Sequence, residues 1–212
     1  PAISADLVIM ATGIRTNLSW IEGSGIETEQ GILVNERQQS NVPNVYAAGD
    51  VAQGRNLITG AREVHAIEPT AMEHGRIVGA NLAGQATQYA GSLIINIVGV
   101  AGLDMASFGT WDNDKAETII GHNSARNAYR KYLFEDGRLT GAIYVGTDAE
   151  TWAGNDLGMM KGLVHAGARL GEWMDYLRAH PFDIKKPYLA SKTVGALLPK
   201  TTLGQPSQSP RE

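Results

Sequence analysis

Residues 44–52 read NVYAAGDVA, and this stretch decides how the fold is interpreted. The apolar run at 45–48 predicts a buried strand, and Gly49 and Asp50 follow at its carboxyl end. Open α/β sheets bind ligands at this edge. A glycine there lets the main chain approach a bulky group, and a carboxylate can accept hydrogen bonds from two hydroxyls. A simple cap on the following turn is an equally good explanation for Asp50, so both interpretations stay open.

An earlier apolar run, at residues 5–10, predicts a strand buried on both faces, as in a parallel sheet. It ends in the small residues Ala11, Thr12 and Gly13, where the backbone can approach a ligand or another strand. A brief further strand is predicted at residues 31–34.

After these strands the apolar period becomes helical, and residues 69–82 predict a helix. Pro69 suits the first helical position, and Gly84 is a stop signal just past the end. Small and apolar residues fall on one stripe, which we expect to pack tightly against a sheet or a cofactor. They are Ala71, Gly75, Val78, Gly79 and Leu82.

The second half of the chain predicts an antiparallel sheet followed by helices. Candidate strands lie at residues 93–98, 106–109, 118–121, 128–134 and 139–145. The turn sequence EDGR at 135–138 predicts a hairpin between the last two strands. Helical segments are predicted at 155–168 and 170–179.

Composition excludes several classes of function. The chain has 212 residues with 22 acidic and 18 basic side chains, a net charge of −4, so nucleic acid is not expected as a partner. No cysteine is present, which excludes a disulfide scaffold and thiol chemistry on these residues. The longest apolar stretch, at 93–103, is shorter than the roughly 20 residues of a membrane span.

Histidine and serine patterns add no catalytic candidate. The five histidines show no metal-ligand spacing, so no metal site is predicted, and we expect solvated or capping roles for them. Three serines lie in no G-x-S-x-G context, so no serine hydrolase is predicted. They are Ser92, Ser107 and Ser124.

Three motifs in order resemble the FAD-dependent pyridine nucleotide–disulfide oxidoreductases. They are ATG at residues 11–13 after an apolar run, VYAAGDVA at 45–52, and a helix with EHG at 73–75 and ANLAG at 80–84. The segment after residue 89 is similar, less specifically, to that family's C-terminal dimerisation domain, in the branch of rubredoxin, nitrite and NADH-oxidase-like reductases.

The resemblance implies an α/β fold, part of a Rossmann-like FAD/NAD(P)-binding domain, followed by an α+β domain with an antiparallel sheet. It assigns 1–16 to the end of the NAD(P)-binding domain, 17–89 to the C-terminal part of the FAD-binding domain, 90–185 to a dimerisation domain and 186–212 to an extended tail. The family needs two glycine-rich phosphate loops, G-x-G-x-x-G, and this chain has none. We therefore expect an N-terminal remainder of the enzyme, in the same gene or in a separate subunit.

Binding roles also follow from the resemblance. Asp50 would bond the ribityl chain of FAD, while Gly49 and Val51 would bring main chain against its ribityl–phosphate portion. A helix start would face the isoalloxazine ring, where the positive end of the helix dipole stabilises negative charge; an ordinary helix start is the alternative. The residues at this start are Glu68, Pro69 and Thr70.

The first motif receives a different role. The resemblance implies that Ala11, Thr12 and Gly13 close the nicotinamide domain, with Gly13 near bound NAD(P)H.

The function implied is that of an oxidoreductase in which a hydride passes from NAD(P)H to FAD, and the electrons then reach a second acceptor. That acceptor is a redox protein such as rubredoxin or ferredoxin, oxygen or peroxide, a disulfide, or nitrite at a further centre. No catalytic residue is assigned. The alternative is a non-catalytic dimerisation or scaffold subunit that keeps the fold without binding flavin.

Expected partners are the N-terminal remainder and a second copy in a homodimer, in the cytoplasm. The basic group of Arg126, Arg130 and Lys131 would suit docking of a small acidic electron carrier, although a solvated strand edge explains it as well.

Overall fold

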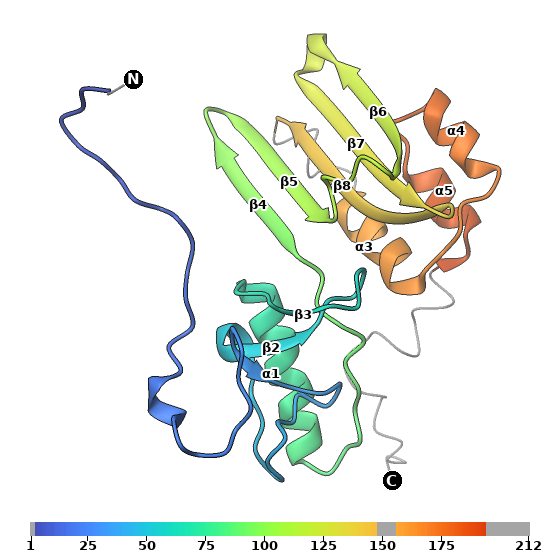
Figure 1. Ribbon diagram of the computed structural model, residues 1–212. Helices are drawn as coiled ribbons and strands as arrows, with labels where there is room; N and C mark the ends of the chain where they lie inside the picture. The colour runs from blue at the N-terminus through green and yellow to red at the C-terminus, as the bar shows by residue number, and fades with distance from the viewer. Residues whose placement is uncertain (1–2, 148–155, 194–212) are drawn as a thin grey trace, which may run out of the picture.

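The computed structural model describes residues 3–147 and 156–193, and two sheets organise them (Figure 1). A small sheet and one helix lie in residues 18–92, here called the N-terminal region. A larger sheet and three helices lie in residues 93–193, the C-terminal region. Residues 3–17 form a separate extended segment.

The small sheet combines parallel and antiparallel pairing. Its strands, in spatial order, are β1 (Ile32–Leu33), β2 (Ala52–Arg55) and β3 (Arg62–Val64). β1 runs parallel to β2, and β3 runs antiparallel to β2. Two 3-10 turns, η1 (Ser19–Ile21) and η2 (Gly49–Val51), accompany it. The short strand predicted at 31–34 is confirmed as β1.

The prediction of a strand at residues 45–48 is wrong, because these residues do not join a sheet. Tyr46 makes only an isolated bridge to Gln39, and the ladder strand β2 begins later, at Ala52. The amide of Ala47 donates to the carbonyl of Gln38 at 3.0 Å, so this segment pairs locally with the preceding loop. The segment is still extended at Ala48 and leads into Gly49 and Asp50, which lie directly before the amino end of β2 and not at the carboxyl end of a sheet strand.

The predicted helix at 69–82 is confirmed as α1 (Glu68–Leu82), but its buried face is not the predicted one. Thr70 and His74 are its buried residues, whereas Gly75, Gly79 and Leu82 are exposed. A Cβ built on Gly75 or Gly79 meets no atom within 4 Å. Hydrogen bonds, described below, explain why polar rather than small residues face inward.

Residues 5–10 were predicted as a buried strand, and the structure contradicts this. They form exposed coil, and Leu7, Val8, Ile9 and Met10 are 74–82% exposed. Figure 1 shows this segment running away from both sheets. Among residues 3–147 and 156–193 no strand pairs with it, so its apolar side chains have no sheet to pack against here.

The large sheet is antiparallel throughout, as predicted. Its strands are β4 (Ile95–Val100), β5 (Leu103–Gly109), β6 (Glu117–Asn123), β7 (Ala128–Glu135) and β8 (Arg138–Gly146). Their spatial order is β4-β5-β8-β7-β6. The predicted hairpin is confirmed: Glu135 pairs with Arg138, and Asp136 and Gly137 both have positive φ, as a tight two-residue turn requires.

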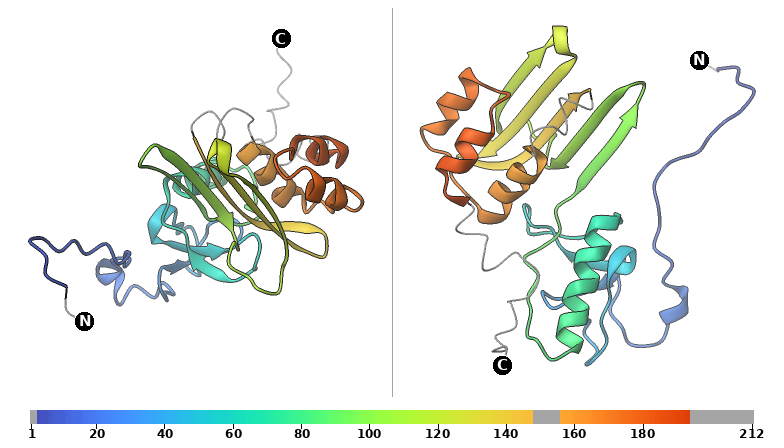
Figure 2. Two further views of the ribbon diagram at one scale, coloured as in Figure 1. Left: turned by 90° about the horizontal axis from the view of Figure 1, so that it is seen from above. Right: turned by 180° about the vertical axis from the view of Figure 1, so that it is seen from behind.

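Helices α3 (Asp156–Ala166), α4 (Trp173–Ala179) and α5 (Lys185–Ala190) cover one face of this sheet (Figure 2). They bury residues such as Leu163, Leu177 and Ile184 against Phe108 and Phe134. α5 forms within the segment that the sequence assigns to an extended tail from residue 186, and the tail beyond residue 193 lies outside the described residues. Over the part of the chain that the structure describes, no helix is both long and apolar enough to cross a membrane.

The expected basic docking surface of Arg126, Arg130 and Lys131 is wrong for Arg130, which is buried. Its side chain is 2% exposed and lies inside the C-terminal region, with Cζ 3.9 Å from the centre of the Tyr144 ring. Its Nη1 also donates to the carbonyl of Tyr129. Because alternate residues of β7 point into the core, Arg130 shares the buried face with Tyr132. Arg130 therefore offers no charge to a protein partner.

Candidate functional site

The site begins at η2, directly before strand β2. Ala48 is extended, and Gly49 then takes a φ of +75°. A Cβ at Gly49 would lie 3.3 Å from the Cβ of Ala71, in the first turn of α1. The left-handed backbone and the close contact with α1 both favour glycine at this position.

Asp50 lies in this turn with its carboxylate exposed. Its backbone carbonyl accepts a hydrogen bond from Thr16 Oγ1 at 3.2 Å. Within residues 3–147 and 156–193 its carboxylate oxygens have no hydrogen-bond partner, so the capping interpretation gains no support. Both oxygens are available to a ligand.

The start of α1 provides the second part of the site. Ile67 is the N-cap and supplies no side-chain cap, and Pro69 occupies the first turn. The amide of Ala71 donates to the Ile67 carbonyl at 3.1 Å, whereas the amides of Glu68 and Thr70 have no partner in the described structure. Unpaired amides and the positive end of the helix dipole favour an anionic group here.

The structure brings η2 and the α1 start together through the contact of Gly49 with Ala71. Six of the nine predicted site residues therefore lie in one place. They are Gly49, Asp50, Val51, Glu68, Pro69 and Thr70.

A pocket of about 600 Å³ lies beside this place. Thr16, which bonds the Asp50 carbonyl, contributes to its wall together with Arg15, and Val64 and Ala66 contribute from the segment leading to α1. Its other lining residues are Ile14, Leu18, Glu29 and Gln30.

The remaining predicted residues are not brought to the site. Ala11, Thr12 and Gly13 are exposed, in coil, and a Cβ built on Gly13 meets nothing within 4 Å. Gly13 has a φ of +100°, a backbone conformation that suits glycine. Their proposed proximity to NAD(P)H stays a prediction.

A half-buried acidic group to which the sequence assigns no role lies one turn into α1. Glu73 Oε2 accepts from the Tyr89 hydroxyl and Oε1 from Lys161 Nζ of α3, each at 2.7 Å. Burial raises the pKa of Glu73, but the hydrogen bonds from Lys161 and Tyr89 outweigh it and leave this pKa below its usual value. Glu73 therefore links α1, the segment before the large sheet, and the C-terminal region.

His74 is the second missed residue, and it is 1% exposed. Gly49 N lies 3.3 Å from its Nδ1, and Ser92 Oγ lies 3.1 Å from its Nε2. Burial lowers the pKa of His74 to about 4, so the imidazole is neutral near pH 7. The motif EHG placed Glu73 and His74 on the helix, but no periodicity signals a buried polar face.

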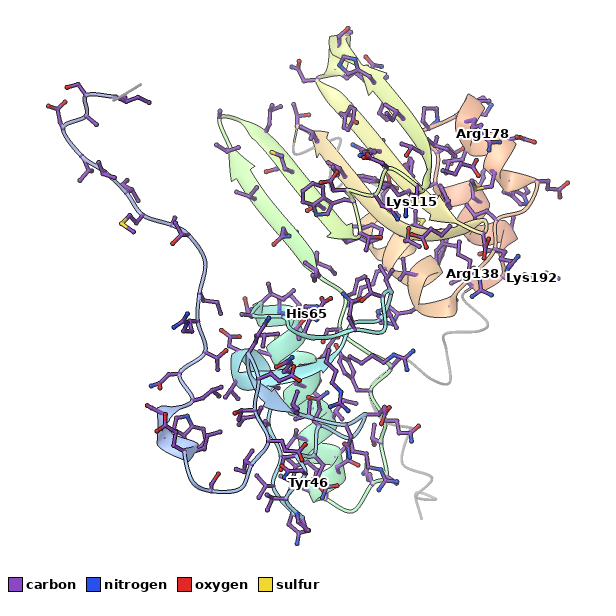
Figure 3. The ribbon with its side chains drawn as sticks, in the orientation of Figure 1. Tyr46, His65, Lys115, Arg138, Arg178 and Lys192 are labelled. Carbon is purple, nitrogen blue, oxygen red and sulfur yellow. The ribbon has the colours of Figure 1, made fainter. Side chains whose placement is uncertain are left out.

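The expectation of solvated or capping histidines is wrong for His65 and His74, and His165 is half-buried with its Nε2 shielded from solvent. His65, near the start of α1 (Figure 3), is 5% exposed, and His74 is buried as described. His65 Nε2 lies 3.1 Å from Glu63 Oε2. Over the described part of the chain, no group of three or more His, Cys, Asp or Glu side chains could hold a metal ion.

Two family models match the chain. One, described as pyridine nucleotide-disulphide oxidoreductase, matches residues 2–75, and the other, described as the rubredoxin NAD+ reductase C-terminal domain, matches residues 95–152.

Among curated proteins, the chain is 36% identical over 147 residues to the epsilon subunit of NADH-dependent phenylglyoxylate dehydrogenase from Aromatoleum evansii. This match covers 68% of the chain and 35% of the relative. The chain is also 26% identical over 144 residues to NADH-rubredoxin oxidoreductase from Clostridium acetobutylicum, covering 68% of the chain and 36% of that protein. The chain thus spans about a third of the length of these two relatives.

Solved structures share the fold. A FAD-dependent pyridine nucleotide-disulphide oxidoreductase from Desulfovibrio vulgaris superposes with a TM-score of 0.70 at 18% identity, covering 92% of this chain and 50% of that one. A NAD-dependent persulfide reductase from A. fulgidus gives a TM-score of 0.69 at 24% identity, with 81% and 35% coverage.

Proposed function

Because the chain belongs to the pyridine nucleotide-disulphide oxidoreductase family, we propose that it is the C-terminal part of a flavoprotein oxidoreductase. In this proposal electrons pass from NAD(P)H through FAD to a second acceptor. The observation that carries the proposal is the packing of the Gly49–Asp50 turn against the first turn of α1. That packing joins, at one site, a carboxylate and helix amides that have no partner among residues 3–147 and 156–193.

The residues present fit FAD. Gly49 lets the turn pack closely against Ala71 at the start of α1, and the exposed Asp50 carboxylate can accept hydrogen bonds from ribityl hydroxyls. The amides of Glu68 and Thr70 favour negative charge on a ring that they face. FAD, when bound, supplies hydride acceptance and onward electron transfer, chemistry that these side chains do not have.

The pocket beside Thr16 supports this placement. Its wall includes Thr16, whose hydroxyl fixes the Asp50 carbonyl, and Ala66, two residues before α1. Through these two residues the pocket lies next to the Asp50 turn and the segment leading into α1, although neither Asp50 nor the α1 start lines it. Ala11, Thr12 and Gly13 are proposed to face NAD(P)H once the N-terminal remainder of the enzyme packs against them.

The electron acceptor and the partners are also part of the proposal. Its relatives include a dehydrogenase subunit and an assimilatory nitrate reductase electron transfer subunit from Bacillus subtilis, which supports an arrangement of several domains or subunits. We propose a homodimer in the cytoplasm. Rubredoxin or ferredoxin, oxygen or peroxide, a disulfide, and nitrite remain the candidate acceptors.

The proposal is tested by expressing the chain together with any coding sequence that precedes residue 1 in its gene. We expect a yellow protein with bound FAD. In the Asp50→Ala variant, loss of a charged acceptor should cost about 1.5–3 kcal/mol, which is roughly tenfold or more in the Kd for FAD. Equilibrium dialysis of FAD measures this change.

Asp114→Ala, in the exposed loop before β6, is the matched control and should leave the Kd unchanged. Equal affinity of Asp50→Ala and wild type would contradict the role of Asp50. A colourless wild-type protein that still assembles in fixed stoichiometry would favour the scaffold subunit instead.

A further inference from the structure

His74 lies between the proposed flavin turn and the connection to the C-terminal region. It is on the second turn of α1, and its ring is 1% exposed. Both ring nitrogens have partners, Gly49 on one side and Ser92 on the other. The buried imidazole thus makes a hydrogen bond at each ring nitrogen. Removing either partner would leave a buried polar atom unpaired, so the arrangement depends on both.

The partners define the protonation state of the ring. Gly49 contributes a backbone N–H, which can only donate, so Nδ1 must be the acceptor in the 3.3 Å contact. The ring proton of neutral His74 therefore lies on Nε2 and is donated to Ser92 Oγ at 3.1 Å. A protonated imidazole would place N–H against N–H at Gly49 and lose this bond.

Ser92 is itself fixed in the fold. It is 2% exposed, its amide donates to the Arg55 carbonyl at 2.8 Å, and its carbonyl accepts from the Leu57 amide at 2.9 Å. These bonds anchor Ser92 at the end of β2. The imidazole therefore ties the Gly49 turn to a rigid point of the small sheet.

The groups around the ring keep it neutral. Burial has the largest effect on the pKa of His74 and lowers it, His65 lowers it further, and the adjacent Glu73 raises it. The Tyr89 ring meets the imidazole edge-on, with centroids 5.0 Å apart. Glu73 is engaged by Tyr89 and by Lys161, so its charge is already partnered.

We propose that His74 is a positioning residue for the flavin: its Nδ1 holds the Gly49 amide and thereby fixes the direction in which Asp50 presents its carboxylate. The hydrogen bond fixes one peptide plane at the residue before Asp50, and Thr16 fixes the carbonyl of Asp50 itself. The flavin part of this inference rests on the proposed function. The brace between Gly49, His74 and Ser92 does not.

The first experiment needs no flavin. In the 212-residue chain, long-range ¹H–¹⁵N NMR of the histidine rings should show neutral His74 protonated at Nε2 at pH 7. The Gly49 amide should be protected from hydrogen exchange and should exchange at least about tenfold faster in His74→Gln, whose amide reaches toward Ser92 rather than Gly49. A proton on Nδ1, or equal exchange in both proteins, would overturn the brace.

The second experiment measures the Kd for FAD in the flavoprotein, with any N-terminal remainder present. Asn places its amide oxygen close to the position of Nδ1, so His74→Asn should keep affinity near wild type while His74→Gln loses about tenfold. His122→Asn, at an exposed position of β6, controls for loss of a histidine. The Asn and Gln variants carry amides of similar polarity, so comparing their Kd values separates positioning from general destabilisation. Melting temperatures measured for both variants show whether either is destabilised.

The outcomes distinguish the two proposals. If wild type binds FAD and the Asn and Gln variants bind it equally well, His74 has no positioning role and the proposed function stands. If wild type binds no FAD, the proposed function fails together with the flavin part of this inference. The NMR and exchange measurements then decide on the brace alone.

Discussion

The interior of the N-terminal region and the interior of the C-terminal region are stabilised by different kinds of interaction. The N-terminal region has a small apolar cluster, and most of its other fully buried side chains are polar. The cluster is Ile21, Ile32, Val34, Ala47 and Ala52, and the polar residues include Gln38, Gln53, Asn56, His65, Thr70 and His74. The C-terminal region instead packs a continuous aromatic and aliphatic core between its sheet and α3–α5.

Gln53 shows how the N-terminal region works. Its side-chain oxygen accepts from the amides of Gln30 and Gly31, and its nitrogen donates to Glu29 Oε2 at 2.9 Å. Hydrogen bonds are directional, so such a side chain sets the orientation of loops, whereas apolar contacts are not directional and mainly supply stability. Directional hydrogen bonds therefore suit the N-terminal region, where the Gly49–Asp50 turn and the start of α1 lie in a fixed relative geometry.

The largest effect is expected from a cavity in the C-terminal region. Phe108 is 1% exposed, so Phe108→Ala should lower the free energy of unfolding by about 3–5 kcal/mol. Hydrogen exchange should localise the loss to residues 93–193. Ile97→Ala, 51% exposed on β4, is the control and should change stability little. An equal loss of protection in residues 31–89 would show that one core serves both regions.

The second prediction concerns acid and the N-terminal region. The pKa of His74 falls from about 6.5 in the unfolded chain to about 4 in the fold, so the unfolded state binds more protons between these values. Stability contributed by neutral His74 is complete above pH 6.5 and is lost as pH falls toward 4. The loss should reach about 3 kcal/mol.

Urea unfolding at pH 7, 6, 5 and 4 measures this loss, with His74→Asn as the reference that lacks the titrating ring. The difference between the two proteins should shrink steadily over this range. Parallel pH profiles would show that burial of His74 has no energetic consequence for folding.

The third prediction tests the directional hydrogen bonds directly. Gln53→Leu keeps the bulk of the side chain but leaves the amides of Gln30 and Gly31 without an acceptor, which should cost about 2–3 kcal/mol. Gln88→Leu, at an exposed position, is the control. Thermal unfolding followed by circular dichroism gives the difference, and equal melting temperatures would mean that the apolar cluster alone supports this region.

The same difference explains what could be predicted from the sequence. In the C-terminal region, alternating apolar residues and the EDGR turn identify strands and a hairpin, because burial there follows the period of the strand. In the N-terminal region, the glycine and acid after an apolar run indicate a candidate site at Gly49 and Asp50. Bonds such as that from Gly49 to His74 join residues 25 positions apart, and no local pattern encodes them.

Two errors have related causes. The stripe of small residues on α1 predicts its buried face, but hydrogen bonds to His74 turn a polar face inward. Residues 5–10 have the apolar character of a buried strand, yet their side chains are exposed because the described part of the chain offers them no neighbouring strand. A hydrophobic pattern predicts that a segment is buried in the folded protein. The pattern does not identify which part of the protein covers that segment.

The smallest effect is expected where the two regions meet. Lys161 of α3 donates to Glu73 of α1 at 2.7 Å, and both side chains keep contact with water, being 34% and 26% exposed. Solvent screening limits such a pair, so Glu73→Gln should cost about 1 kcal/mol. Because the Tyr89 hydroxyl can still donate to the amide oxygen, the change removes mainly the charge.

A double-mutant cycle with Lys161→Gln isolates the pair from the Tyr89 bond, and the coupling should weaken as salt is raised. The exposed pair of Arg178 with Glu117 lies wholly within the C-terminal region and serves as a control that cannot couple the two regions. Leu57 and Ile58 of the N-terminal region also pack against the C-terminal core, so the ion pair is one part of the link between the regions. If the whole link is weak, Phe108→Ala should unfold the C-terminal region at a lower urea concentration than the N-terminal region. A single transition for both, with a coupling of several kcal/mol between Glu73 and Lys161, would instead mean that charge at this contact binds the polar and apolar regions into one cooperative unit.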